Sequence, residues 1–96
     1  MKSLNLRYRI SPDVIFQEVH LGESLLLNVK TLAYFSFDEL GTRIWGAMQE
    51  TDDADLLLRH LEPECGLPLE SLTMKVTAIL HGLEGSGLIA FEPVPC

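Results

Sequence analysis

The hydrophobic pattern changes its period part-way along the chain, from the spacing of strands to the spacing of helices. Short runs rich in leucine, β-branched and aromatic residues predict three strands, at residues 14–19, 24–29 and 33–37. Their connections are short enough for hairpins, so we expect an antiparallel meander with the third strand at its edge. In the second strand we expect one face to carry Leu25, Leu27 and Val29, and the opposite, exposed face to carry Asn28.

Helical spacing begins directly after the third strand. Asp38 is a suitable N-cap because its carboxylate can accept a hydrogen bond from an unpaired amide of the first turn. From there Leu40, Ile44 and Met48 recur on one face, with Trp45 beside them. The third strand and the first helix should therefore be rigidly coupled, with no linker between them.

Two further helices follow. The second has cap candidates at residues 51–53, a leucine-rich body at residues 56–61, and an expected end near Pro63. The third opens at Pro68, which suits a first turn, and stops at Gly85 and Gly87. Its apolar stripe runs over Leu69, Leu72, Val76, Ile79, Leu80 and Leu83.

This order of elements predicts an α+β domain of the winged helix-turn-helix kind, with a three-stranded antiparallel sheet followed by three helices. We expect one domain over residues 1–96. Residues 1–12 form an extended arm that is a candidate for pairing at a sheet edge, residues 88–91 return against the core, and residues 92–96 form a proline-rich tail.

Composition and charge narrow the class of function. A chain of 96 residues that is 47% hydrophobic can build one core but not a deep enclosed active site as well, which favours a binding module. Its 14 acidic and 7 scattered basic residues give a formal charge of −7, which argues against nucleic acid and against an anionic membrane surface. The absence of a secretory signal and of a long apolar run predicts a cytoplasmic location.

No catalytic or metal-binding pattern is visible. The three histidines, His20, His60 and His81, have no spacing that would place two on one face. Cys65 lies in an expected loop and has no recognisable neighbour that would activate its thiol. Cys65 and Cys96 are too few to form a zinc site. The chain also lacks a phosphate-binding glycine loop and a serine nucleophile elbow. We therefore expect no enzyme activity, no metal and no cofactor.

The third strand is the candidate binding element. Phe35, Phe37 and Trp45 are expected mainly in the core, but the strand ends a meander and carries no lysine or proline to block its outer edge. Such an edge can accept an incoming peptide as an additional strand. The alternatives are that the N-terminal arm covers it, or that it serves homodimerisation.

The third helix offers a second wall for the same site. Ser71, Lys75, Ala78 and Gly82 lie on the flank beside its apolar stripe, at a spacing that would let another chain come close. An apolar peptide side chain could enter there. The competing interpretation is that these small residues only allow one helix to pack on another.

These residues resemble the PqqD family, the peptide-recognition elements of ribosomally made, post-translationally modified peptides. The resemblance covers about residues 14–89 and is most specific in residues 34–45, YFSFDELGTRIW. That run matches the family's two aromatics, small residue, apolar residue, Asn or Asp, Glu, Gly and Ile-Trp pair. A second match consists of Val76, Ile79, Leu80, Leu83 and Gly87-Leu88.

The resemblance implies that a precursor's leader peptide adds as a strand beside the third strand and under the third helix. It implies a non-catalytic protein that hands the leader to a leader peptidase, as in lasso-peptide pathways, or to another modifying enzyme such as a radical-SAM enzyme. The chain departs from the family pattern at Leu32, where glycine is usual, at Lys75, where an acidic residue is common, and at Leu67, a poor helix cap.

The edge of the third strand and the flank of the third helix together form the expected peptide site. We expect peptide contact at Leu32, Ala33, Tyr34, Phe35, Ser36, Phe37, Ser71, Lys75, Ala78, Ile79 and Gly82. A winged-helix DNA-binding regulator is the less favoured alternative, because Lys75 is the single lysine or arginine in the third helix. A proline at Phe35 is the substitution that the sequence suggests for blocking the edge.

Overall fold

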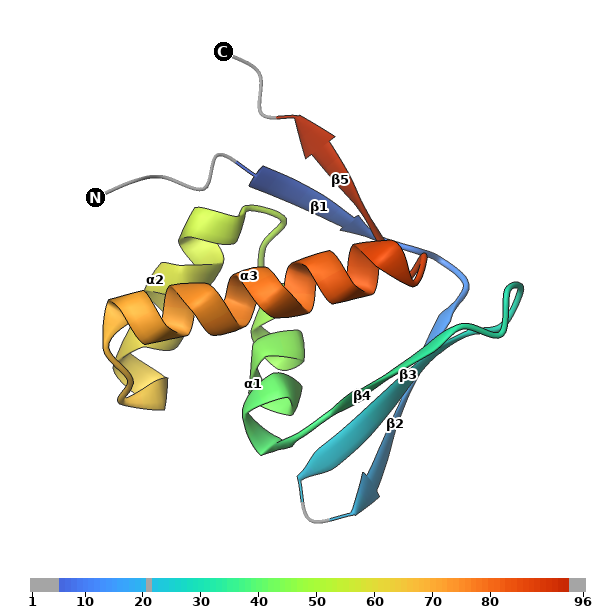
Figure 1. Ribbon diagram of the computed structural model, residues 1–96, viewed down its shortest axis with the longest axis horizontal. Helices are drawn as coiled ribbons and strands as arrows, with labels where there is room; N and C mark the ends of the chain where they lie inside the picture. The colour runs from blue at the N-terminus through green and yellow to red at the C-terminus, as the bar shows by residue number, and fades with distance from the viewer. Residues whose placement is uncertain (1–5, 21, 94–96) are drawn as a thin grey trace.

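The computed structural model describes residues 6–20 and 22–93 (Figure 1). Its elements are β1 (Leu6–Ile10), β2 (Val14–His20), β3 (Glu23–Asn28), β4 (Tyr34–Phe37), α1 (Glu39–Met48), α2 (Ala54–Cys65), α3 (Leu69–Gly85) and β5 (Ile89–Pro93). The three predicted strands and three predicted helices are therefore present and in the predicted order. The fold is α+β, with three helices and a three-stranded antiparallel sheet.

The three-stranded sheet, which we call the wing, has the order β2-β3-β4. Both neighbouring pairs are antiparallel, with Leu26 opposite Phe16 on one side and opposite Phe35 on the other. The predicted meander is confirmed, and β4 lies at an edge of it. In Figure 1 the wing extends below α3, and α1 follows directly from the end of β4.

The two faces of β3 are the reverse of the prediction. Ser24, Leu26 and Asn28 are buried, whereas Leu25 and Leu27 are only half-buried. The polar pair can lie inside because both side chains are hydrogen-bonded. The Ser24 hydroxyl lies 2.8 Å from that of Thr42 on α1.

Asn28 is satisfied by a set of bonds that ties three segments together. Its amide nitrogen donates to the carbonyl oxygen of Gly87 at 3.1 Å. Its amide oxygen accepts from the backbone N–H groups of Lys30 and Thr31, at 2.9 and 3.2 Å. A residue expected on the exposed face thus connects the β3-β4 turn to the end of α3.

The described part of the N-terminal arm, from Leu6 onward, does not cover the wing. Residues 6–10 of the arm form β1, which pairs antiparallel with β5 in a separate two-stranded ribbon, while residues 1–5 lie outside the described chain. In the ribbon Leu6 lies opposite Pro93, and Arg9 pairs with Glu92 at 2.9 Å. The tail expected at residues 92–96 therefore begins inside β5, and residues 94–96 also lie outside the described chain.

The helix starts follow their caps, and one helix end differs from the prediction. Asp38 accepts from the N–H of Gly41, and Asp53 accepts from the N–H groups at the start of α2. The second helix continues past Pro63 to Cys65 and ends at Gly66, whose φ of 64° is left-handed. Pro63 lies in the last turn, where the lost N–H costs one bond and the helix is about to end.

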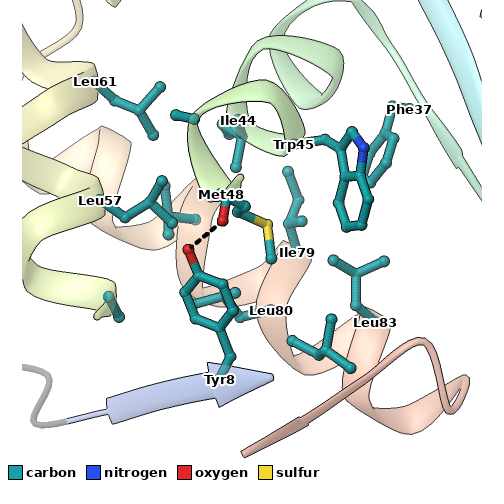
Figure 2. Packing of buried hydrophobic residues seen from close by; sticks show 14 of the residues in the cluster. Tyr8, Phe37, Ile44, Trp45, Met48, Leu57, Leu61, Ile79, Leu80 and Leu83 are labelled. Carbon is teal, nitrogen blue, oxygen red and sulfur yellow. Dashed lines mark hydrogen bonds between the residues drawn. The ribbon is translucent and has the colours of Figure 1, made fainter. Parts of the chain in front are cut away.

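The core lies between the three helices and the inner face of the wing. Figure 2 shows Ile44 and Met48 of α1 between Leu57 and Leu61 of α2 and the apolar stripe of α3. The same view places Phe37 of β4 against Trp45, and Tyr8 of β1 below Met48.

Tyr8 makes a polar contact inside this core. Its hydroxyl donates to the carbonyl oxygens of Met48, at 3.1 Å, and Thr51, at 2.6 Å. The predicted apolar stripe of α3 is confirmed by its buried Leu72, Val76, Ile79, Leu80 and Leu83. By contrast, Leu56 of α2 is 51% exposed and takes no part in the core.

Within residues 6–20 and 22–93, no helix has the length and apolar character needed to cross a membrane.

Candidate peptide-binding edge

The outer edge of β4 presents backbone groups to which no other described strand is paired. The N–H of Asn28 donates to the carbonyl oxygen of Ala33 at 2.9 Å, so these two residues face each other across the β3-β4 pair. The direction in which backbone N–H and C=O groups point alternates along an antiparallel strand, so those of Phe35 and Phe37 also face β3. Tyr34 and Ser36 consequently point their N–H and C=O groups outward.

The third helix runs alongside β4 in the opposite direction. A Cβ built on Gly82 would lie 2.6 Å from Cε2 of Phe35, so this ring rests on the helix backbone. Nζ of Lys75 lies 3.6 Å from a carboxylate oxygen of Asp38. These two contacts fit one antiparallel arrangement. Phe35 and Asp38 are three residues apart on an extended chain, Gly82 and Lys75 are seven residues apart on a helix, and each separation is about 10 Å.

The structure brings the predicted site residues together on these two elements and, for Leu32 and Ala33, in the turn that leads into β4. Among them the exposed ones are Leu32, Tyr34, Ser36, Ser71, Lys75 and Ala78, and the half-buried ones are Ala33, Phe35 and Gly82. Two predicted contact residues, Phe37 and Ile79, are 4% and 7% exposed. These two side chains belong to the core and support the site from beneath.

Stacked aromatic rings hold β4 in place. The ring centroids of Phe35 and Phe37 are 5.2 Å apart, and those of Phe37 and Trp45 are 6.2 Å apart. Phe16 of β2 also stacks on Trp45, with a centroid distance of 6.4 Å. Offset and tilted pairs of this kind add to the apolar burial. The prediction that Phe37 and Trp45 are core residues is confirmed, and Phe35 packs against the same cluster.

The one ion pair at the site is exposed. The side chains of Lys75 and Asp38 are 43% and 59% exposed, so the pair contributes little to stability. Asp38 has a second task, because its other carboxylate oxygen accepts from the N–H of Gly41 at 2.7 Å. Lys75 therefore lies at the junction of β4 with α1, where it can exchange its partner at low cost.

The hairpin that leads into β4 contains a strained residue. Leu32 has a φ of 66°, in the left-handed region, and its side chain is 71% exposed. This is the position at which the resemblance described above implies a glycine. The turn is stabilised by Asn28, whose side-chain oxygen accepts hydrogen bonds from the N–H groups of Lys30 and Thr31.

The described residues hold no group of three His, Cys, Asp or Glu side chains that could bind a metal ion. Cys65 ends α2 rather than lying in a loop and is half-buried. His81 packs edge-on against Phe91 with a centroid distance of 5.4 Å. Cys65 and His81 are thus accounted for by the end of α2 and by packing on Phe91, and neither lies at the β4 edge.

Sequence reasoning missed a second open edge. It belongs to β2, the other outer strand of the wing, where a shallow hollow of about 510 Å³ lies between β2 and α1. Its lining includes Val14, Phe16 and Trp45. The alternation of Val14 and Phe16 with Ile15 was the available signal.

The fold has a close counterpart among solved structures. A structure described as TbiB1 in complex with the TbiA(beta) leader peptide superposes with a TM-score of 0.74 and 23% sequence identity. The match covers 85% of this chain and 94% of that chain. At this identity the likeness establishes the fold. No curated protein gives a match.

The sequence itself establishes the family. The family model described as coenzyme PQQ synthesis protein D (PqqD) matches residues 23–89, more than half of the chain, from the start of β3 to the start of β5. The matched part contains β4, α3 and every residue of the candidate site. The chain therefore belongs to the PqqD family.

Proposed function

We propose that this protein binds the leader peptide of a ribosomally made precursor, as an additional strand on the outer edge of β4. The observation that carries the proposal is the combination of two outward-facing backbone positions, Tyr34 and Ser36, with an exposed row of α3 residues beside them. The PqqD match and the leader peptide in the TbiB1 structure support it.

Backbone pairing supplies the general part of this recognition. Tyr34 and Ser36 each offer one N–H and one C=O, which an extended peptide can pair with whatever its side chains are. The short strand allows only a few such bonds, and each contributes about 0.5–1.5 kcal/mol net. Side-chain contacts must therefore decide which peptide is bound.

Selectivity comes from the flank of α3. A peptide residue opposite Phe35 would direct its side chain to the same face of the sheet as Phe35, toward α3. On that flank of α3, Ala78 is small and exposed. It lies between Gly82, against which the Phe35 ring packs, and the charged group of Lys75. An apolar anchor fits this place, and an acidic residue two positions along the peptide, on the same face, can pair with Lys75.

We further propose that the bound leader is handed to a separate enzyme, as the resemblance to the PqqD family implies. We favour a leader peptidase of a lasso-type pathway, with a radical-SAM or other modifying enzyme as the alternative. In this proposal the protein is not itself an enzyme, acts in the cytoplasm, and uses a winged helix-turn-helix arrangement for peptide binding.

A DNA-binding role is less consistent with the charges. Lys75 is the single lysine or arginine of α3, and it is paired with Asp38. A helix that enters the major groove needs several cationic or amide side chains facing the bases and phosphates. Binding to duplex DNA that weakens steeply with salt would support this role instead.

The test titrates synthetic peptides that span the leader of a precursor encoded beside this gene. Ser36→Pro removes an outward N–H and leaves the β3-β4 bonds intact, whereas a proline at Phe35 would break the hairpin. We expect saturable binding by the unmodified chain and by the control Ser36→Ala. Ser36→Pro should bind at least about tenfold more weakly, a loss of about 1.4 kcal/mol.

Circular dichroism and thermal melting should be the same for both Ser36 variants, which separates loss of binding from loss of fold. Equal binding by Ser36→Pro would show that the peptide lies elsewhere. Failure of every leader segment to bind the unmodified chain would refute the proposal as a whole.

A further inference from the structure

We propose that the outer edge of β2 is a self-association surface, on which β2 of a second copy pairs antiparallel about a two-fold axis at Phe16. This inference goes beyond peptide binding, because it assigns a role to the edge of the wing that lies opposite β4. The pairing would join two wings into one continuous sheet and leave both β4 edges open.

The backbone of β2 is free to make this pairing. The N–H of Val29 donates to the carbonyl oxygen of Asp13 at 2.9 Å, which sets the alternation along β2. Asp13 and every second residue after it face β3. Val14, Phe16 and Glu18 therefore point their backbone groups outward, and within the described chain β2 has β3 as its one strand neighbour.

This edge is also unusually apolar for a surface strand. Ile15, Phe16 and Val19 are 53%, 39% and 57% exposed, and the strand has no lysine or proline. Long, apolar, unblocked edges are those that pair with other chains. The ring of Phe16 stacks on Trp45 and borders the hollow between β2 and α1, so a second apolar side chain can pack there without displacing the core.

The regular part of β2 fixes the register in which a second copy would pair. Pairing with β3 becomes irregular between Glu18 and His20, so the straight stretch is residues 14–18. That stretch pairs with itself over its full length only when Phe16 lies opposite Phe16 of the second copy. Val14 then meets Glu18 of the second copy, and Ile15 meets Gln17 of the second copy. No acidic residue faces another one, and the two phenylalanine rings lie side by side.

Two features of the chain oppose this association and set its strength. The side-chain amide of Gln17 donates to the carbonyl oxygen of Glu18 at 3.0 Å, and so competes for one outward acceptor. Each copy also carries a formal charge of −7, so the copies repel each other at low ionic strength. Association should therefore be weak and should increase as salt screens the charges.

The first experiment measures the mass of the full chain by sedimentation equilibrium, from low micromolar to near-millimolar concentration at moderate salt. We expect the mass to rise from 10.7 kDa toward twice that value. Phe16→Pro removes an outward N–H and the ring but keeps every β2-β3 bond, and it should stay at the monomer mass. Ser36→Pro, on the β4 edge, should associate as the unmodified chain does.

A second pair of variants tests the register and does not depend on a proline. Val14→Glu places a carboxylate opposite Glu18 of the second copy, and Val14→Lys places an ammonium group there. The two substitutions should disturb the fold of a single copy to a similar degree, because both replace the same half-buried valine with a charged side chain. We expect Val14→Glu to weaken the association and Val14→Lys to strengthen it.

A constant monomer mass at the highest concentration would overturn the proposal. So would a dimer that persists in Phe16→Pro, or one that is lost in Ser36→Pro, because the pairing would then use another surface. An equal effect of the two Val14 substitutions would overturn the register centred on Phe16. None of these results depends on whether a leader peptide binds at β4.

Discussion

The ring of Phe35 lies directly on the backbone of Gly82, so that a Cβ added to Gly82 would approach Cε2 of Phe35 to 2.6 Å. This contact sets how close β4 and α3 can come at one end of the candidate site. No side chain other than hydrogen fits between them. Gly82 is therefore a packing residue of the site rather than only a flexible point in the helix.

Substitution Gly82→Ala should separate the two elements. An added methyl group in a filled contact costs about 1–3 kcal/mol, whereas replacing a helical glycine by alanine gains up to about 1 kcal/mol. Gly46→Ala in α1 is the matched control, because a Cβ there meets no atom within 4 Å. We expect the control to be the more stable of the two by about 1–3 kcal/mol in urea denaturation. Equal stabilities would mean that Phe35 moves away freely.

Asp38 combines a helix cap with an exposed ion pair, and two substitutions separate these contributions. Asp38→Asn keeps an oxygen that can accept from the N–H of Gly41 but loses the charge facing Lys75. Asp38→Ala loses both. We expect the alanine variant to lose about 1 kcal/mol of unfolding free energy, and the asparagine variant to lose about 0.5 kcal/mol or less. A larger loss in Asp38→Asn would show that the ion pair dominates.

Leu32→Gly should stabilise the protein. A residue with a Cβ pays about 1–2 kcal/mol in the left-handed region, and the greater freedom of glycine in the unfolded chain costs about 0.4–1 kcal/mol. The Leu32 side chain is 71% exposed, so little packing is lost. Ala33→Gly is the control, since Ala33 lacks a positive φ and should only lose stability. A lower melting temperature for Leu32→Gly than for the unmodified chain would contradict this account of the turn.

Tyr8 gives the fold a specific dependence on alkaline pH. Burial raises the pKa of the Tyr8 phenol above its ordinary value of 10.0, and the carboxylates of Asp52 and Asp53 raise it further. The unfolded chain then loses this proton at a lower pH than the folded chain does. The contribution of the neutral phenol is complete below pH 10.0 and declines as the pH rises above that value.

Tyr8→Phe should change both the level and the slope of this dependence. At neutral pH the variant loses a buried hydroxyl that donates to the carbonyl oxygens of Met48 and Thr51, at a cost of about 1–2 kcal/mol. Above pH 10.0 its unfolding free energy should fall less steeply than that of the unmodified chain, so the two curves converge. Parallel curves from denaturant titrations across this pH range would refute the assignment to Tyr8.

The order and type of the main elements could be predicted because local signals agreed with the fold. Asp38 caps α1 where the aromatic strand ends, and the stripe of α3 has an unambiguous helical period. The second helix was expected to end near Pro63 and runs two residues further, to Cys65, because a proline in the last turn loses only one bond and the left-handed Gly66 decides the end.

The errors share a cause in long-range contacts. Asn28 is buried because the carbonyl of Gly87 lies within its reach, 59 residues further on, and no local pattern reports that partner. Likewise, the arm became β1 because residues 89–93 pair with it. For the candidate site, residue spacing identified the strand edge and the helix flank. Only the register of β3 with β4 shows that the backbone N–H and C=O groups of Ser36 point outward and those of Phe35 do not.

The ribbon of β1 and β5 has a practical consequence for how this domain can be joined to other proteins. Leu6 lies opposite Pro93, so the chain enters and leaves the fold at neighbouring points, and in Figure 1 this ribbon and the wing lie on opposite sides of α3. A short linker could close the two ends, and new termini could be cut in the β2-β3 turn at Gly22, to give a circular permutant. By the same geometry, the whole unit can be inserted into a surface loop of an enzyme while α3 separates its β4 edge from the junction.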